Sequence, residues 1–275
     1  MSKVKVGEVY NLNEGGSATV IEYEHSDRVL VRHNDKYGYE QTVQAGHLKR
    51  GTVKNPYYPS VCGVGYIGVG RHKISKGRKH FLVYKKWRGM LVRCYCEKYQ
   101  TKKPSYLGCT VSEEWHNFQV FAEWFYSNFN GSNNCELDKD LLVIGNKVYS
   151  SETCALIPRE INMFAKRFNK DNGLPIGVGK NGKSYFARIY EEGESKWLGT
   201  YDNIESALKV YIEAKNRIAR NLAFKWKNKI SFEAHQALLY WDEYENSKFI
   251  FDENAKIAKP DSFSEPNLKP YLNKH

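Results

Sequence analysis

The segment 136–162 constrains the fold most, because a polar loop joins two short apolar stretches in it and a helix-forming stretch follows. Leu137 and Asp138 end the first apolar stretch, and Pro158 stands where the second should stop. The pattern predicts a strand, a loop, a second strand and a helix. Such a unit holds one carboxylate beside one helix-borne amide, a pair that can bind a hard divalent cation together with several waters.

The balance of charge favours a polyanionic partner. The chain carries a net charge of +11, a sequence pI of about 9.2 and a mean hydropathy of -0.65. Nucleic acid is the first candidate partner, and the alternative is a basic surface that only contacts solvent. Twenty tyrosines lie among these cations, which suits stacking and phosphate contacts as well as ordinary packing.

No window of the sequence approaches the roughly 20 apolar residues of a membrane span, and no apolar signal core follows the basic start. We therefore expect a cytoplasmic protein, in the host cell if a phage encodes it, with reduced cysteines and no membrane partner. Cys94 and Cys96 are separated by one residue and the other cysteines stand alone, so no pair has zinc-knuckle spacing. A cysteine site assembled from distant parts of the chain stays open.

The chain is long enough for two or three small domains, and its patterns predict an α+β protein. Alternating short stretches with glycine-bearing turns predict a small N-terminal β-barrel-like domain or a twisted sheet. A helix around Trp241 and an extended, proline-containing tail are expected at the C-terminus. The predicted domains are 1–55, 56–172 and 173–228, followed by the C-terminal helix and extended tail over 229–275.

The segment 71–103 is strongly basic, with twelve Lys or Arg against the single acid Glu97. Trp87, Met90 and Cys94 recur in it at helical spacing, which predicts a helix with one apolar stripe. Interleaved aromatic residues favour contact with a phosphate backbone over a merely solvated face. The cations of this helix that are candidates for DNA contact are Lys85, Lys86, Arg88 and Arg93.

The segment 110–129 predicts a further helix, because Thr110 and Glu113 have capping-box spacing and large apolar residues follow at steps of three and four. We expect this helix to pack the core beneath 136–162. His116 lies off the apolar stripe, as either a surface histidine or one with a chemical role.

The segment 173–228 predicts three antiparallel strands and one helix. Tight turns are expected at 181–182 and near 192–193, and Asp202 and Glu205 suit the start of the helix. The helix would cover one face of the sheet and leave the other free. We expect the free face to carry Lys180, Lys183, Tyr185, Lys196 and Trp197. A core position for Trp197 is the alternative.

The stretches 177–178, 187–189 and 197–201, with the alanine-bearing helix over 205–219, resemble the plant ethylene-response-factor type of DNA-binding domain, the Apetala-two fold. The resemblance implies that the sheet lies in the DNA major groove, with arginines and tryptophans as readers. This chain has fewer arginines on the strands than the plant domains. The contact candidates are Lys180, Lys183, Arg188, Lys196 and Trp197.

The stretches 84–87, 90–95 and 137–162, with Trp115 and Phe118, resemble phage-borne HNH homing-type endonucleases. In that family an Asp-His pair ends the first strand of a ββα-metal domain. An acidic residue and a helix Asn bind one divalent metal on the scissile phosphate. The resemblance implies that Mg²⁺ or another divalent cation is held by Asp138, Asp140 and Asn162.

Lys139 stands where that family has the histidine that deprotonates water, so the implied catalytic set is Asp138, Lys139 and Asn162. A lysine is ordinarily protonated at neutral pH and suits phosphate binding better than proton abstraction. Cleavage by metal-bound water, recruitment of His116 or His80, and loss of cleavage all stay open. We expect a metal-dependent endonuclease or nickase acting on double-stranded DNA; the alternative is a catalytically silent DNA-binding regulator or interference factor.

Overall fold

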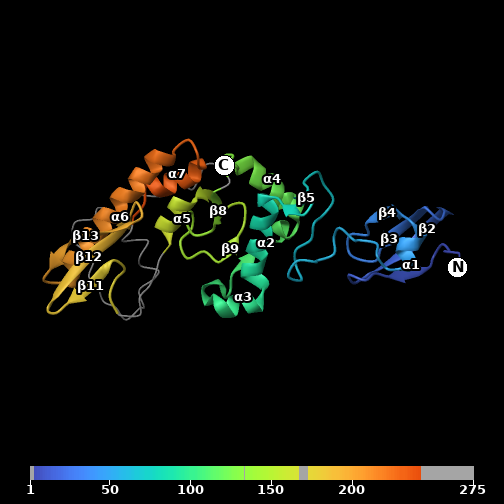
Figure 1. Cartoon of the computed structure of the whole chain (residues 1–275), viewed down its shortest axis with the longest axis horizontal. Helices are drawn as coiled ribbons and strands as arrows, with labels where there is room; N and C mark the ends of the chain where they lie inside the picture. Colours follow the sequence, from blue (N-terminus) through green and yellow to red (C-terminus); the bar gives the residue numbers. More distant parts are fainter. Residues whose placement is uncertain (1–2, 133, 167–172, 243–275) are drawn as a thin grey trace. The chain divides into compact units, whose positions relative to one another are not determined.

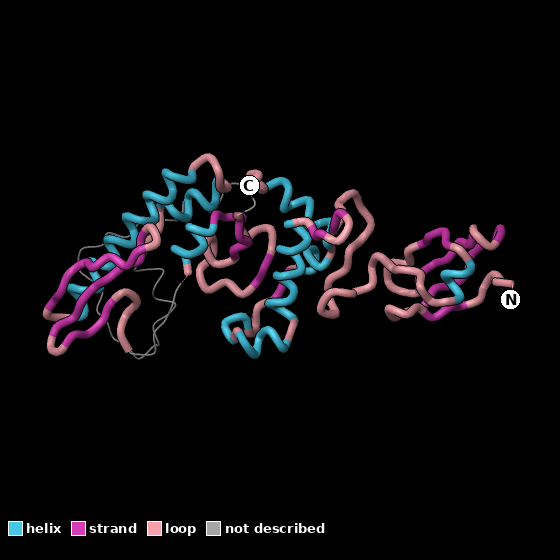
Figure 2. The backbone as a smooth tube through the Cα atoms, viewed as in Figure 1, coloured by secondary structure: helices cyan, strands magenta, loops and turns pink. Residues whose placement is uncertain are grey.

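The computed structural model describes residues 3–132, 134–166 and 173–242. The chain divides into two compact units, 1–159 and 160–275. Each unit combines helices with small sheets (Figures 1 and 2). The α+β class predicted from the sequence is therefore confirmed.

The first unit begins with a four-stranded antiparallel sheet in the order β1-β2-β3-β4. Alternate side chains of β2 and β3 point to one face, where Val20 and Val31 are buried with Leu48 of α1. The sheet is open, because β1 and β4 are not paired with each other, and no closed barrel occurs in the described residues. The barrel-like expectation for this domain is wrong. The elements are β1 (Val9–Asn11), β2 (Ser17–His25), β3 (Arg28–His33), β4 (Glu40–Val43) and α1 (Ala45–Lys49).

A short hairpin leads into the first long helix. It consists of β5 (Ser75–Lys76) and β6 (Lys79–His80), and α2 (Leu82–Tyr95) follows directly. The apolar stripe predicted for this helix is confirmed, since Trp87, Met90 and Cys94 are all buried in it. Two shorter helices come next, α3 (Glu97–Lys102) and the 3-10 helix η1 (Pro104–Tyr106).

The segment 110–129 is not the single helix that its spacing predicts. It divides into the strand β7 (Thr110–Val111), the 3-10 helix η2 (Glu113–His116) and α4 (Phe118–Asn128). Asn117, not Thr110, caps α4, and its side chain accepts a hydrogen bond from the Gln119 amide at 2.9 Å. The prediction failed because β7 pairs in parallel with β9 (Val148–Tyr149), a distant partner that local spacing does not reveal.

An aromatic core supports the acidic segment. Trp87, Trp115 and Phe118 are fully buried, and the Trp87 indole donates a hydrogen bond of 2.7 Å to the Trp115 carbonyl. Leu137 and Leu156 pack in the same core from β8 (Cys135–Asp138) and β10 (Ala155–Pro158), which pair antiparallel. The predicted strand, loop and second strand are confirmed, and α5 (Arg159–Ala165) follows as the predicted helix.

The second unit contains a three-stranded antiparallel sheet in the order β11-β12-β13, backed by α6. Asn203, rather than the predicted Asp202 and Glu205, caps α6 by accepting a hydrogen bond from the Ser206 amide at 2.8 Å. The elements are β11 (Val178–Asn181), β12 (Ser184–Glu191), β13 (Glu194–Tyr201), α6 (Ile204–Trp226) and α7 (Phe232–Leu239). The predicted C-terminal tail lies outside the described residues.

Among the described residues, the helices are all too short or too polar to cross a bilayer.

Candidate nucleic-acid interface and acidic loop

Asp138 closes a tight turn at the end of β8. Its Oδ1 atom accepts hydrogen bonds from the backbone amides of Asp140 and Leu141, at 3.0 and 2.7 Å. Burial raises the pKa of the Asp138 carboxyl, and the nearby Asp140 carboxylate raises it further, against the two amide bonds that lower it. This is the geometry of an aspartate that shapes its own loop.

Lys139 turns inward rather than toward solvent. Its side chain is only 9% exposed, and its Nζ atom donates to Asp140 Oδ1 and to the Asn146 carbonyl, each at 2.5 Å. The Asn146 side chain donates in return to the carbonyls of Lys139 and Val148, at 2.9 and 2.6 Å. The ammonium group therefore joins the two ends of the loop 139–146.

These contacts test whether the acidic loop suits a divalent cation. One oxygen of Asp138 is engaged by two amides, and one oxygen of Asp140 already binds the Lys139 ammonium. Asn162, the third implied ligand, belongs to α5 in the second unit. As the loop is arranged, one carboxylate oxygen of each aspartate is already bound within the protein, and a cation beside Asp140 opposes a second cation there, so the residues do not fit the implied ion.

The two histidines considered as substitute bases lie on other elements. His116 ends η2, where its Nε2 atom is 3.4 Å from the Tyr95 hydroxyl, and burial lowers the pKa of His116. His80 ends β6, and its ring lies 4.7 Å from that of Tyr84. Within the described part of the chain, neither histidine is hydrogen-bonded or ion-paired to the acidic loop.

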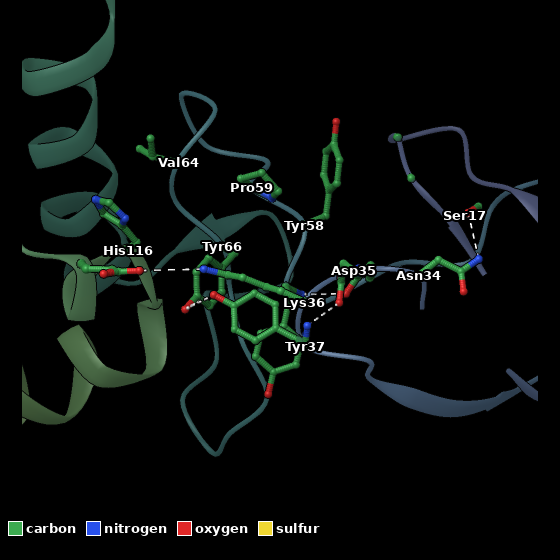
Figure 3. Close-up of a pocket in the computed structure, with 15 residues that line it drawn as sticks. Ser17, Asn34, Asp35, Lys36, Tyr37, Tyr58, Pro59, Val64, Tyr66 and His116 are labelled. Carbon is green, nitrogen blue, oxygen red and sulfur yellow. Dashed lines mark hydrogen bonds and ion pairs between the residues drawn. The ribbon is translucent and has the colours of Figure 1, made fainter. Parts of the chain in front are cut away.

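His116 also borders a cleft of about 290 Å³ in the first unit (Figure 3). The Tyr37 and Tyr57 rings stack there with centroids 4.5 Å apart, and the Tyr37 hydroxyl lies 3.0 Å from that of Tyr66. The Lys36 ammonium lies 3.8 Å from the Glu113 carboxylate. The tyrosine contacts pack one wall of the cleft, whereas the Lys36–Glu113 pair is exposed and contributes little to stability.

The structure separates the candidate cations of α2 into two kinds. Lys86 is 16% exposed and binds Glu136 at 2.7 Å, and Arg93 is half-buried between two tyrosine rings while its Nε donates to the Gly89 carbonyl at 3.1 Å. Lys85 and Arg88 are exposed. The first pair stabilises the fold, and only the second pair remains available to a phosphate backbone.

The face of the three-stranded sheet away from α6 carries an exposed aromatic pair. The rings of Phe186 and Trp197 stack at 4.7 Å with planes 19° apart, and Trp197 is 58% exposed. Arg188 lies opposite Trp197 in the register, with its guanidinium 6.0 Å from the Phe186 ring. Gly179 lies opposite Phe186, and a Cβ atom there would collide with that ring. The result is a cation and two stacked rings on a free sheet face.

Three of the expected residues do not lie on this face. Lys196 pairs in register with the buried Ile189, so it points to the α6 side, where it binds Glu191 at 3.0 Å. Lys180 pairs with Tyr185, which shares the side of Val178 rather than that of Phe186. The expectation that these residues share the free face is wrong, because charge rather than strand alternation guided it. Lys183 is exposed in the turn between β11 and β12.

Sequence reasoning also missed residues that the sheet face and the loop depend on. The alternation of Phe186, Arg188 and Tyr190 with the buried Ala187 and Ile189 could have placed Phe186 beside Trp197. Asn146 gave no comparable signal, because its role depends on a lysine seven residues away.

Comparison of the chain with protein-family models, with curated proteins and with solved structures found no match.

Proposed function

We propose that this protein binds double-stranded DNA and that its HNH-like segment is a scaffold that does not cleave. The proposal rests first on the free face of the β11-β12-β13 sheet. Trp197, exposed beside Arg188 and stacked on the half-buried Phe186, is apolar surface that a folded protein leaves in solvent at a free-energy cost. Bases or sugars stack on such rings, and arginine contacts guanine edges or phosphates.

The net charge of +11 supports the same partner, because it favours any polyanion electrostatically. The resemblance of this strand and helix pattern to ethylene-response-factor domains favours duplex DNA as the polyanion. The proposed contacts on this unit are Arg188 and Trp197 on the sheet face and Lys183 in the exposed turn at its edge.

The acidic loop supports the non-cleaving form of this function. Lys139 replaces the family's histidine and binds Asp140 and the Asn146 carbonyl directly, which leaves the carboxylates committed to the loop. In this form the protein binds DNA without cutting it and acts as a regulator or interference factor.

Metal-dependent cleavage of the phage homing type is the second candidate. The observed order of β8, an acid-bearing loop, β10 and α5 favours it, since this is the element order of the ββα-metal unit. Cleavage would require the Lys139–Asp140 bond to open before Asp138, Asp140 and Asn162 could serve as ligands.

Fluorescence anisotropy with a labelled duplex tests the binding proposal. Trp197→Ala should weaken binding roughly 5- to 150-fold, the range expected from about 1–3 kcal/mol per stacked base. Phe224→Ala is the matched control, because Phe224 is 68% exposed on α6 and lies off the sheet. Equal affinities of the two variants, or no binding by the wild-type protein at low salt, would refute the proposal.

A further inference from the structure

The first unit contains a basic hairpin that the proposed function does not use. No Asp or Glu occurs between Gln41 and Cys96, so the cations of this region have no acidic neighbour in sequence. The hairpin formed by β5 and β6 lies in the middle of this region, immediately before α2 (Figure 1). Its turn is made by Gly77, with φ of +59°, and Arg78.

The base of the hairpin is firmly attached to the core. The backbone of His72 exchanges hydrogen bonds with the Gln119 side chain of α4, at 2.9 and 3.0 Å. Glu123, one turn further along α4, binds both Arg71 and His72. On the other side, the Phe81 amide donates to the Ile74 carbonyl at 3.0 Å, and Ile74 packs against the aromatic core. The hairpin is thereby preorganised at its base.

The exposed cations in and beside the hairpin are different, because none of them has a partner in the described part of the chain. Within residues 3–132, 134–166 and 173–242, none of them forms an ion pair or a side-chain hydrogen bond, and all are exposed. These unpaired cations of the hairpin are Lys73, Lys76, Arg78 and Lys79, and Lys85 and Arg88 follow on α2.

Neighbouring cations in the same segment differ from those of the hairpin in having protein partners. Arg71, Lys86 and Arg93 each bind a protein group that stabilises the fold, whereas the hairpin tip holds like charges close together. Lys76 and Lys79 are directly opposite in the register, an arrangement that is unfavourable without an anion between them. Regularly spaced phosphates supply such anions.

We propose that the β5–β6 hairpin is a second DNA-contact surface, which binds the phosphate backbone of the duplex without reading its sequence. The inference rests on the proposed DNA binding, and it assigns to the first unit a contact separate from the sheet face of the second. Each neutralised phosphate releases counterions, so the hairpin contributes to the salt dependence of binding more than to base preference.

The test compares two triple variants of the full chain that remove the same charge. Lys76→Ala/Arg78→Ala/Lys79→Ala removes the hairpin tip, and Lys98→Ala/Lys102→Ala/Lys103→Ala removes three exposed cations at α3. Duplex affinity is measured by anisotropy between about 50 and 200 mM salt. The hairpin variant should lower the slope of log affinity against log salt by about 2.7, from roughly 0.9 for each lost contact, while the α3 variant should leave it near wild type.

Melting temperatures of both variants should match the wild type, because all six residues are exposed. Equal slopes for the two variants would overturn the hairpin contact and leave DNA binding by the sheet intact. The double variant Lys76→Arg/Lys79→Arg keeps both charges, so its slope should equal that of the wild type. A wild-type protein that binds RNA hairpins but no DNA duplex would overturn both the hairpin contact and the proposed function.

Discussion

Replacing Lys139 by methionine tests the role assigned to its ammonium group. Lys139→Met keeps most of the buried aliphatic side chain and removes the charge that bridges Asp140 and the Asn146 carbonyl. We expect the loop 139–146 to open and the first unit to lose stability. The substitution also removes the cation that competes with a metal for the Asp140 carboxylate.

The size of the effect follows from the two contacts. A hydrogen bond of a charged donor contributes about 1.5–3 kcal/mol when both partners are buried. The Asp140 side chain is 48% exposed, so water replaces much of that bond and its loss costs only about 0.5–1 kcal/mol. The bond to the Asn146 carbonyl adds about 1.5 kcal/mol. The total is roughly 2 kcal/mol, or a shift of about 1 M in the urea midpoint for a typical slope of unfolding.

Urea unfolding of the full chain and hydrogen exchange of the loop amides measure this effect. The amides of Asp140 and Leu141 should exchange faster in Lys139→Met than in wild type, because the loop that orders them has lost its bridge. Lys98→Met on the exposed face of α3 is the control and should change neither observable. Unchanged exchange and an unchanged midpoint in Lys139→Met would refute the bridging role.

Three further substitutions, a pH dependence and the addition of Mg²⁺ give further predictions. Arg93→Met should destabilise the first unit by about 1–3 kcal/mol in urea unfolding, because the carbonyl bond and two ring contacts are lost, but should leave duplex affinity unchanged. Gly177→Ala should lower the melting temperature of the second unit, because Gly177 has φ of +81° and an added Cβ would collide with the Tyr211 ring. Burial lowers the pKa of His33, so the folded chain binds fewer protons there than the unfolded chain. The free energy of unfolding should therefore fall as the pH drops through about 6.5. The fall should be less steep in His33→Gln. A ligand that binds only the folded state raises the melting temperature. Because the carboxylates of the acidic loop are already bound within the protein, addition of Mg²⁺ should leave the melting temperature of the wild-type chain unchanged.

The regular elements were largely predictable because their signals are local. The stripe of α2 and the three strands of the second unit follow from periodicity and turn residues within a few positions of each other. At the turn between β12 and β13, Glu192 and Gly193 both adopt positive φ, as the turn expected near them requires.

The failures arose where distant residues decide the conformation. Thr110 has capping-box spacing with Glu113, but Thr110 and Val111 pair with β9, which lies almost forty residues further along the chain. Lys196 looked available as a cation, yet its register opposite Ile189 turns it toward Glu191. A bulge near Arg188 shifts that register, and charge alone cannot indicate such a shift.

The candidate site likewise has one part that local sequence predicts and one part that depends on distant residues. The acidic turn after β8 was evident from the sequence, because Asp138 ends an apolar stretch. The inward direction of Lys139 was not, since it depends on the Asn146 carbonyl and on the return of the chain beneath the loop. From the sequence alone, a lysine between two carboxylates could equally be exposed and bind phosphate. Only the position of Asn146 beside it shows that it is buried in the loop.

Binding and cleavage measured in the same sample decide whether the protein binds DNA without cutting it. Supercoiled plasmid is incubated with the wild-type protein in Mg²⁺, in Mn²⁺ or in chelator, with Asp138→Ala in parallel. Bound complex is quantified by gel retardation, and strand breaks are quantified after the protein is removed. We expect retarded plasmid that stays supercoiled under every condition. Metal-dependent nicking by the wild type that Asp138→Ala abolishes, or the absence of any retarded complex, would contradict it.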